Sequence, residues 1–216
     1  QVLLTPSSGR GIPPARRQEL LQWARENGGW LIEDDYNGEL RYRARPVPAL
    51  QGMGGEEWVA YIGSFSKLLL PSVRLGYMVL PPRLSRRYDG RFLAYHQTAS
   101  KIEQLALASY ISQGYLEKHL RRMRKLYAEK SSLLLRALRD TFGKEAVISL
   151  QETSLTVRVT LPGLQGEKAV EAARENGIRL RVGGEKNESL ILGFAGIPTE
   201  KIAAGVRALE KCLKGL

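Results

Sequence analysis

Residues 64–77 have the sequence SFSKLLLPSVRLGY and place one lysine, Lys67, between two apolar segments. The segment Trp58–Gly63 precedes this stretch and Leu75–Leu80 overlaps its end, and both have the composition of short buried strands. A lysine is nucleophilic at neutral pH only where burial or neighbouring positive charge lowers its pKa. The pattern therefore makes Lys67 a candidate nucleophile at the end of a strand.

Phosphate-binding side chains surround this lysine in the sequence. Ser64 and Ser66 supply hydroxyl groups and Arg74 supplies a guanidinium, and both kinds of group suit phosphate oxygens. A lysine that forms a Schiff base beside a phosphate clamp is what pyridoxal phosphate (PLP) chemistry requires. The four residues of the Ser-x-Ser-Lys motif alone are more typical of an exposed loop lysine, so the hypothesis depends on the rest of the chain.

Carboxylates follow a short apolar strand about thirty residues earlier. Trp30–Ile32 runs into Glu33, Asp34, Asp35 and Tyr36. Ligands of open α/β sheets bind beyond the carboxyl ends of the strands, where a carboxylate can pair with a protonated pyridine nitrogen. The alternative is that the two aspartates cap a turn, which is common for this residue type. The carboxylates and the lysine together, in this order, favour a PLP site.

At this point the sequence resembles the MocR/GabR-type regulators of the GntR superfamily, bacterial transcription factors whose C-terminal domain is similar to fold type I aminotransferases. The resemblance covers nearly the whole chain. The matching segments are 33–36 (EDDY), 39–42 (ELRY), 47–50 (VPAL), 63–67 (GSFSK), 74–77 (RLGY), 112–115 (SQGY), 119–127 (HLRRMRKLY) and 192–197 (LGFAGI).

The resemblance implies a role for each residue of the candidate site. It makes Lys67 the Schiff-base lysine, Asp34 the partner of the pyridine nitrogen and Tyr36 the contact to the phenolic oxygen of PLP. The phosphate group is assigned to Ser64, Ser66 and Arg74. The family's pattern in the loop 5–14 is missing here, and the loop is shortened.

The pattern of elements predicts an α/β protein, with a mostly parallel sheet followed by a smaller α+β domain. We expect residues 1–114 to be the second part of a PLP-binding large domain, 115–142 a long connecting helix and 143–216 the small domain. The expected strands are 2–4, 30–34, 58–63, 75–79, 146–150, 155–161, 178–182 and 189–195. The expected helices are 15–27, 84–98, 101–112, 115–141, 167–175 and one beginning at Thr199.

Composition narrows the function classes. The 216 residues carry a formal net charge of +11, 43% hydrophobic residues and one cysteine, Cys212, which excludes an internal disulfide and fits the cytoplasm. No apolar stretch is long enough to span a bilayer, and no signal peptide opens the chain, which starts with Gln1 like an interior fragment. His96 and His119 lack neighbouring ligands at metal-binding spacing, so no metal site is predicted.

The basic excess lies mainly in 83–91 and 118–130, which have helical patterns and no helix-turn-helix signature. The resemblance implies that this chain is a sensor that responds to an amine, an amino acid or PLP. By the resemblance, DNA is bound through an N-terminal winged-helix domain outside the chain, and the protein is a homodimer.

Two alternatives to the sensor remain. One is a genuine aminotransferase that acts on an amino acid; the other is a degenerate fold that binds no cofactor. An aminotransferase normally holds the substrate carboxylate with an arginine of the small domain. The strand 189–194 lacks the arginine found there in many aminotransferases, and Arg158, Arg179 and Arg181, with Lys186, are the candidates to replace it. At most weak or partial transamination is expected.

Overall fold

The computed structural model describes residues 2–4, 12–35, 38–43, 48–92, 98–150, 154–184 and 187–214, with only the backbone for 2–4 and the side chains of 89–92 left out. The chain divides into two compact units, residues 1–122 and 123–216. Each unit is described here by itself. The three-part division expected from the sequence stays a prediction.

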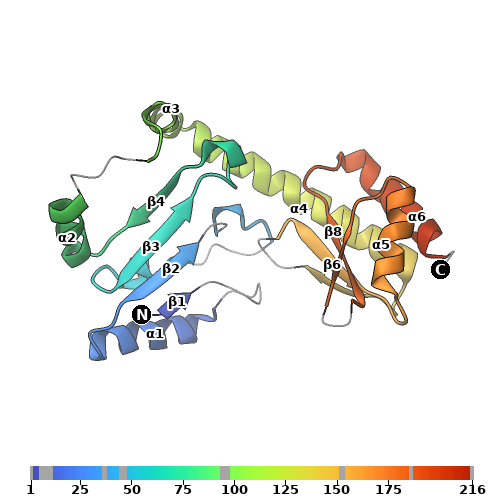
Figure 1. Cartoon of the computed structure of the whole chain (residues 1–216), viewed down its shortest axis with the longest axis horizontal. Helices are drawn as coiled ribbons and strands as arrows, with labels where there is room; N and C mark the ends of the chain where they lie inside the picture. Colours follow the sequence, from blue (N-terminus) through green and yellow to red (C-terminus); the bar gives the residue numbers. More distant parts are fainter. Residues whose placement is uncertain are drawn as a thin grey trace. The chain divides into compact units, whose positions relative to one another are not determined.

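Unit 1 is built on a four-stranded sheet with the order β1-β2-β3-β4 (Figure 1). The strands are β1 (Val2–Leu4), β2 (Leu31–Asp35), β3 (Val59–Ser64) and β4 (Gly76–Val79). β1, β2 and β3 are parallel, and β4 runs antiparallel to β3. The helix α1 (Pro14–Glu26) connects β1 to β2, as a βαβ unit requires. Short 3₁₀ turns lie at Gly38–Leu40, Gln51–Met53 and Pro71–Val73.

One face of this sheet is covered by α1. Leu21 and Ala24 of α1 pack with Leu31 of β2, with Val59 of β3 and with Leu50 of the loop between these strands in a buried apolar cluster. The helix begins at a proline, whose fixed φ suits a first helical turn, and it ends before Gly28, which has a φ of +59°. Alternation along β2 and β3 then directs Leu31, Glu33 and Asp35 to the α1 face and Ile32 and Asp34 to the opposite face.

A buried ion pair joins α1 to β2. A terminal nitrogen of Arg17 lies 2.7 Å from Oε1 of Glu33, and both side chains are 9% exposed. Oε2 of Glu33 accepts a hydrogen bond of 2.8 Å from the backbone N–H of Leu50, and Arg17 also donates to the carbonyl oxygen of Pro48. Glu33 thus holds α1 and the loop before β3 in place.

We expect Glu33→Ala to lower the free energy of unfolding by about 3–5 kcal/mol, because it leaves the Arg17 guanidinium buried without its counter-ion. Glu19→Ala is the matched control. Its partner Arg16 is 2.7 Å away, but the two side chains are 63% and 60% exposed, and such pairs contribute about 0–1 kcal/mol. Urea unfolding of both variants measures the difference; equal losses would contradict a structural role for the buried pair.

Three helices follow the sheet in the sequence: α2 (Pro82–Phe92), α3 (Lys101–Ser112) and α4 (Tyr115–Phe142). Gly114, with a φ of +74°, separates α3 from α4. Among its described residues, α3 has none that is buried, although it carries Ile102, Leu105 and Ile111. It therefore presents apolar surface.

Unit 2 is an α+β fold with a wholly antiparallel sheet of order β5-β6-β8-β7. Its elements are β5 (Val147–Leu150), β6 (Thr156–Thr160), α5 (Gly166–Glu175), β7 (Arg181–Gly183), β8 (Ser189–Gly193) and α6 (Ile202–Leu213), the last preceded by a 3₁₀ turn at Thr199–Lys201. Ala169 and Ala173 of α5, Leu190 of β8 and Leu209 of α6 form its core. The helices therefore pack on one face of the sheet.

The expected α/β fold is confirmed, with differences at element ends. α3 has the predicted bounds, and the other helices begin within two residues of the predicted positions, except that α6 proper begins at Ile202, after the 3₁₀ turn. Several predictions were too long: Thr98 is not helical, residues 178–180 are not part of β7, and β8 ends at Gly193 instead of Ala195. Ile178 and Leu180 pack against the α5–α6 core, but ladder pairing with β8 begins only at Arg181.

Candidate functional site

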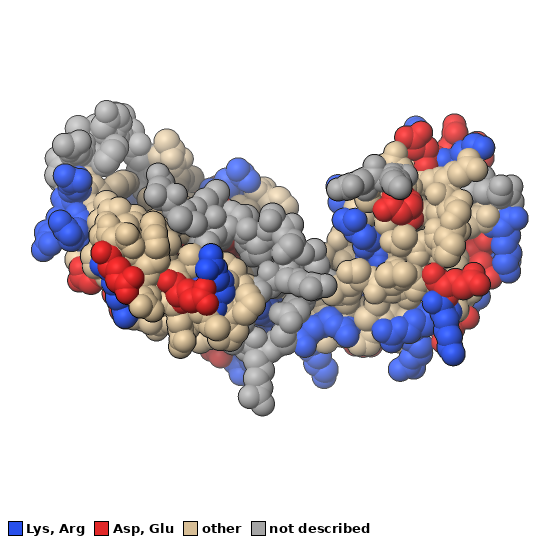
Figure 2. All heavy atoms as spheres, turned by 90° about the horizontal axis from the view of Figure 1, so that it is seen from below, with Lys and Arg blue, Asp and Glu red and all other residues tan. Residues whose placement is uncertain are grey.

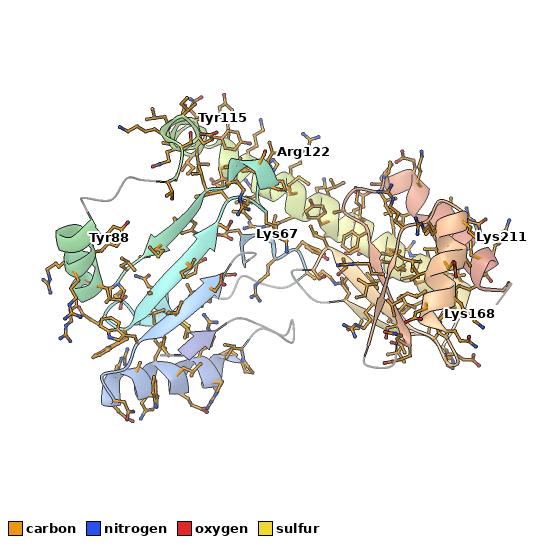
Figure 3. The ribbon with its side chains drawn as sticks, viewed as in Figure 1. Lys67, Tyr88, Tyr115, Arg122, Lys168 and Lys211 are labelled. Atoms are coloured by element: carbon orange, nitrogen blue, oxygen red, sulfur yellow. The ribbon has the colours of Figure 1, made fainter. Side chains whose placement is uncertain are left out.

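The candidate residues of unit 1 lie at or just after the ends of β2 and β3, two neighbouring parallel strands. Asp34 pairs in register with Ile62 and Asp35 with Gly63, so β2 and β3 end at the same edge of the sheet. Figure 3 shows Lys67 just beyond that edge, in the turn after β3. The carboxyl ends of parallel strands are where open α/β sheets bind ligands.

The three successive carboxylates at the end of β2 differ in their surroundings. The carboxylate of Glu33 forms an ion pair with Arg17 and accepts a hydrogen bond from the N–H of Leu50. Asp35 accepts a hydrogen bond of 3.4 Å from the Tyr61 hydroxyl. Asp34 lies on the opposite face, and within the described part of the chain no hydrogen bond or ion pair ends on it. Of the three, Asp34 is therefore the carboxylate available to a ligand, which fits a partner for a pyridinium nitrogen.

Backbone hydrogen bonds fix the turn that carries Lys67. Phe65 donates its N–H to Leu75 (2.9 Å), and Leu69 donates to Phe65 (2.9 Å), so the chain closes one helical turn around the lysine. Leu68, the next residue, is only 3% exposed and anchors the turn. The Lys67 side chain is exposed, yet partial desolvation by the surrounding protein lowers the pKa of its ammonium group. A lowered pKa is what a lysine nucleophile needs.

His119 of α4 supports the same turn from the other side. Its Nε2 lies 3.0 Å from the carbonyl oxygen of Leu68. A carbonyl oxygen only accepts hydrogen bonds, so Nε2 of His119 carries the proton. The sequence did not predict this contact, because the two residues are 51 positions apart and a histidine in a helical pattern carries no signal of its partner.

The residues predicted to hold the phosphate lie on both sides of this turn. Ser64 ends β3, and its hydroxyl accepts a hydrogen bond of 3.3 Å from the N–H of Ser66. Arg74 is exposed and has a left-handed backbone, with φ of 47° and ψ of 31°. Left-handed geometry costs a residue with a side chain about 1–2 kcal/mol, and such strain is concentrated at functional sites. These groups fit an anion such as the phosphate of PLP.

Tyr36, the predicted contact to the phenolic oxygen, lies outside the described residues, as do His96 and Lys186. The other residues predicted to bind PLP, namely Asp34, Ser64, Ser66, Lys67 and Arg74, all belong to unit 1.

Two of the arginines that are candidates to bind a substrate carboxylate lie on the same face of the unit 2 sheet. Arg158 of β6 and Arg181 of β7 both pair in register with Ile191 of the central strand β8. They therefore flank Ile191 on the face away from the α5–α6 core, to which Leu190 points. Both are exposed, and no ion pair joins either of them to another described residue. Two guanidiniums on one face without a counter-ion favour an anionic ligand.

Other kinds of site find less support. No group of three or more His, Cys, Asp and Glu residues among those described is arranged to hold a metal ion. Across the described residues, no helix is long and apolar enough to cross a bilayer. On the face shown in Figure 2, Lys and Arg side chains are interspersed with Asp and Glu, so the charge of +11 does not gather there into one basic patch.

Comparison with known proteins relates the chain to regulators and to aminotransferases. No protein-family model matches it. The regulator YhdI of Bacillus subtilis, described as an uncharacterized HTH-type transcriptional regulator, is 39% identical over 203 residues, which are 90% of the chain and 43% of that protein. The probable rhizopine catabolism regulatory protein MocR of Rhizobium meliloti is 35% identical over the whole chain and 46% of its own length. The chain thus spans about half the length of these relatives.

The solved structures that it resembles are aminotransferases. LysN, the α-aminoadipate aminotransferase of Thermus thermophilus, crystallised with N-(5′-phosphopyridoxyl)-L-leucine, matches with a TM-score of 0.77 and 31% identity over 99% of the chain and 58% of that structure. The kynurenine aminotransferase of Pyrococcus horikoshii, solved with PMP, matches with a TM-score of 0.76 and 30% identity, over 96% and 53%. The fold is that of the fold type I aminotransferases.

Proposed function

Since the chain belongs to the MocR/GabR family as its aminotransferase-like part, we propose that it is the PLP-binding effector domain of a bacterial transcription regulator of the GntR superfamily. One observation carries the proposal: Asp34, near the end of β2, and Lys67, in the turn after β3 and with a lowered pKa, lie at the same edge of the sheet on adjacent parallel strands. PLP supplies an electrophilic aldehyde and an electron-withdrawing ring. The chain supplies the groups that hold both in place.

Each candidate residue has a defined task in this proposal. Asp34 keeps a proton on the ring nitrogen, because a nearby negative charge favours the cation. Tyr36 contacts the phenolic oxygen. Lys67 is the amine that meets the aldehyde, and its lowered pKa makes a larger fraction of it neutral than for an ordinary lysine. The hydroxyls of Ser64 and Ser66 and the Arg74 guanidinium hold the phosphate and so keep the aldehyde within reach of the lysine.

The effector is an amine, an amino acid or PLP itself. The pair Arg158 and Arg181 on unit 2 supports an effector that carries a carboxylate, because two guanidiniums on one sheet face, with no ion pair to any described residue, suit such a group. Ile191 between them occupies the centre of the strand in which the sequence lacks an arginine. This difference favours sensing over efficient transamination.

The partners follow from the same proposal. DNA is bound through an N-terminal winged-helix domain outside this chain, and the protein works as a homodimer in the cytoplasm. The exposed apolar side chains of α3, with Ile102 79% and Leu105 69% exposed, support a second copy as the partner of that helix. A monomeric full-length protein in analytical ultracentrifugation would contradict the dimer.

The test of the proposed function is a spectroscopic titration of the full-length protein with PLP, followed by amino acids and small amines. We expect visible absorbance on addition of PLP, a change of that absorbance with one class of amine, and a matching change in the affinity of the full-length protein for DNA. Efficient catalytic turnover of an amino acid with an oxo acid, without any effect on DNA binding, would instead support the aminotransferase alternative. The 31% identity to the 2-aminoadipate transaminase of Thermus thermophilus supports testing this alternative.

A further inference from the structure

A cluster of two tyrosines and two carboxylates lies on the α1 side of the unit 1 sheet, opposite to the face of Asp34. Tyr61 of β3 donates to Oδ2 of Asp35 at 3.4 Å. Tyr77 of β4 donates to Oε1 of Glu39 at 3.1 Å. The two rings are neighbours, with centroids 6.0 Å apart. We call these four residues the tyrosine cluster.

The backbone around the cluster is shaped to admit it. A Cβ atom at Gly63 would collide with the ring of Tyr77, so this strand position must be glycine for the ring to cross it. A Cβ atom at Gly38 would collide with the carboxylate of Asp35. The Tyr77 ring also packs on Phe65, with centroids 5.2 Å apart, in the turn that carries Lys67. The tyrosine cluster therefore packs closely against Gly38 after β2 and against Phe65 in the turn after β3.

The two tyrosine hydroxyls of the cluster stay protonated and therefore remain hydrogen-bond donors to the carboxylates. Burial raises the pKa of Tyr61, and the charge of Asp35 raises it further. Burial raises the pKa of Tyr77, and the charge of Glu39 adds to it. Each carboxylate therefore keeps its hydrogen bond across the physiological pH range. Neither tyrosine has a part in the site described above, and sequence reasoning had used them only as strand residues and as part of a motif.

We propose that Tyr61 and Tyr77 are positioning residues of the cofactor site, and that they act by holding Asp35 and Glu39 against the sheet. Asp35 directly follows Asp34, the proposed partner of the ring nitrogen, so the hydrogen bond from Tyr61 fixes the end of β2 that carries Asp34. Tyr77 holds the 3₁₀ turn Gly38–Leu40 through Glu39, and its ring packs on Phe65 in the turn that carries Lys67. The inference rests on the proposed PLP site.

The test compares Tyr61→Phe and Tyr77→Phe in the full-length protein, since each keeps its ring and loses only the hydroxyl. We expect each variant to bind PLP about tenfold more weakly, and the bound cofactor to have a shifted absorbance maximum, because hydrogen bonds to charged groups are among the stronger ones. In the cofactor-free protein, amide hydrogen exchange of residues 38–43 should be faster, while the melting temperature stays within about 2 °C of wild type.

Conservative substitutions of the two carboxylates test whether an acceptor oxygen is sufficient to keep the PLP affinity. Asp35→Asn and Glu39→Gln each keep an acceptor oxygen for the tyrosine, so affinity within about threefold of wild type is expected. Tyr88→Phe, which removes the hydroxyl of an exposed tyrosine on α2, is the matched control and should change nothing.

The outcomes separate this inference from the proposed function. If the wild-type protein took up no PLP, the proposed function would fail and the inference with it. If the wild type bound PLP but both phenylalanine variants matched it in affinity and spectrum, only the inference would be overturned. A loss of affinity accompanied by an equal loss in thermal stability of the cofactor-free protein would likewise overturn it, because the tyrosines would then be structural.

Discussion

Borohydride reduction of the full-length protein with PLP should attach the cofactor covalently to Lys67, and Lys67→Ala should abolish the attachment. The lysine stands beyond the end of β3 with a pKa lowered by desolvation, so a larger fraction of it is neutral than for an ordinary lysine. The extent of labelling should therefore rise with pH and reach half of its maximum below pH 10.5, the usual pKa of a lysine. Peptide mapping by mass spectrometry identifies the labelled residue.

The Lys67→Ala protein should still bind PLP without covalent attachment, because Ser64, Ser66 and Arg74 remain. We expect a loss of about 100-fold in reducible label and a smaller loss in affinity, since the phosphate contacts are charge-assisted hydrogen bonds. Lys101→Ala, which removes an exposed lysine at the start of α3, is the control and should label like wild type. Label on Lys101, Lys118 or Lys125 instead of Lys67 would refute the assignment of the site.

Asp34→Ala should weaken PLP binding by about 10- to 100-fold and blunt any reaction of the bound cofactor with amines. The hydrogen bond that it removes joins a carboxylate to a protonated ring nitrogen, and bonds to charged groups contribute about 1.5–3 kcal/mol. Asp34→Asn separates charge from shape: it fills the same space but cannot favour the protonated ring, so we expect it to behave like Asp34→Ala. Fluorescence titration with PLP measures both affinities.

The neighbouring carboxylate provides the control. Asp35→Asn keeps an oxygen that accepts the Tyr61 hydrogen bond and should retain most of the affinity. The opposite pattern, in which Asp34→Ala binds normally and Asp35→Asn does not, would identify Asp35 as the ring partner and Asp34 as a turn residue.

Much of this fold could be predicted from local patterns. The apolar run of β2 and the helical spacing of α1 predicted a parallel βαβ unit, and the structure confirms it. Alternation within β2 also limits which carboxylates can share a face, because neighbouring residues of a strand point to opposite sides. The motif around Lys67 predicted a turn directly after a strand, and the lysine lies in such a turn.

Pairings between distant segments could not be predicted. The contact of His119 with Leu68 spans 51 residues, and that of Tyr77 with Glu39 spans 38. Nothing in one sequence reports such partners. The same holds for Arg158 and Arg181, which became neighbours of Ile191 only through the strand register. The sequence offered three arginines for the carboxylate, and register brought two of them to one sheet face.

The left-handed backbone of Arg74 has a consequence for any redesign of this protein. Glycine has the lowest cost in that conformation, so selection for thermal robustness alone would replace the arginine with glycine. If Arg74 holds the phosphate, as proposed, this position exchanges stability for ligand affinity. Stability-guided libraries should therefore hold residue 74 constant, because the substitution to glycine that they would rank as beneficial removes the guanidinium.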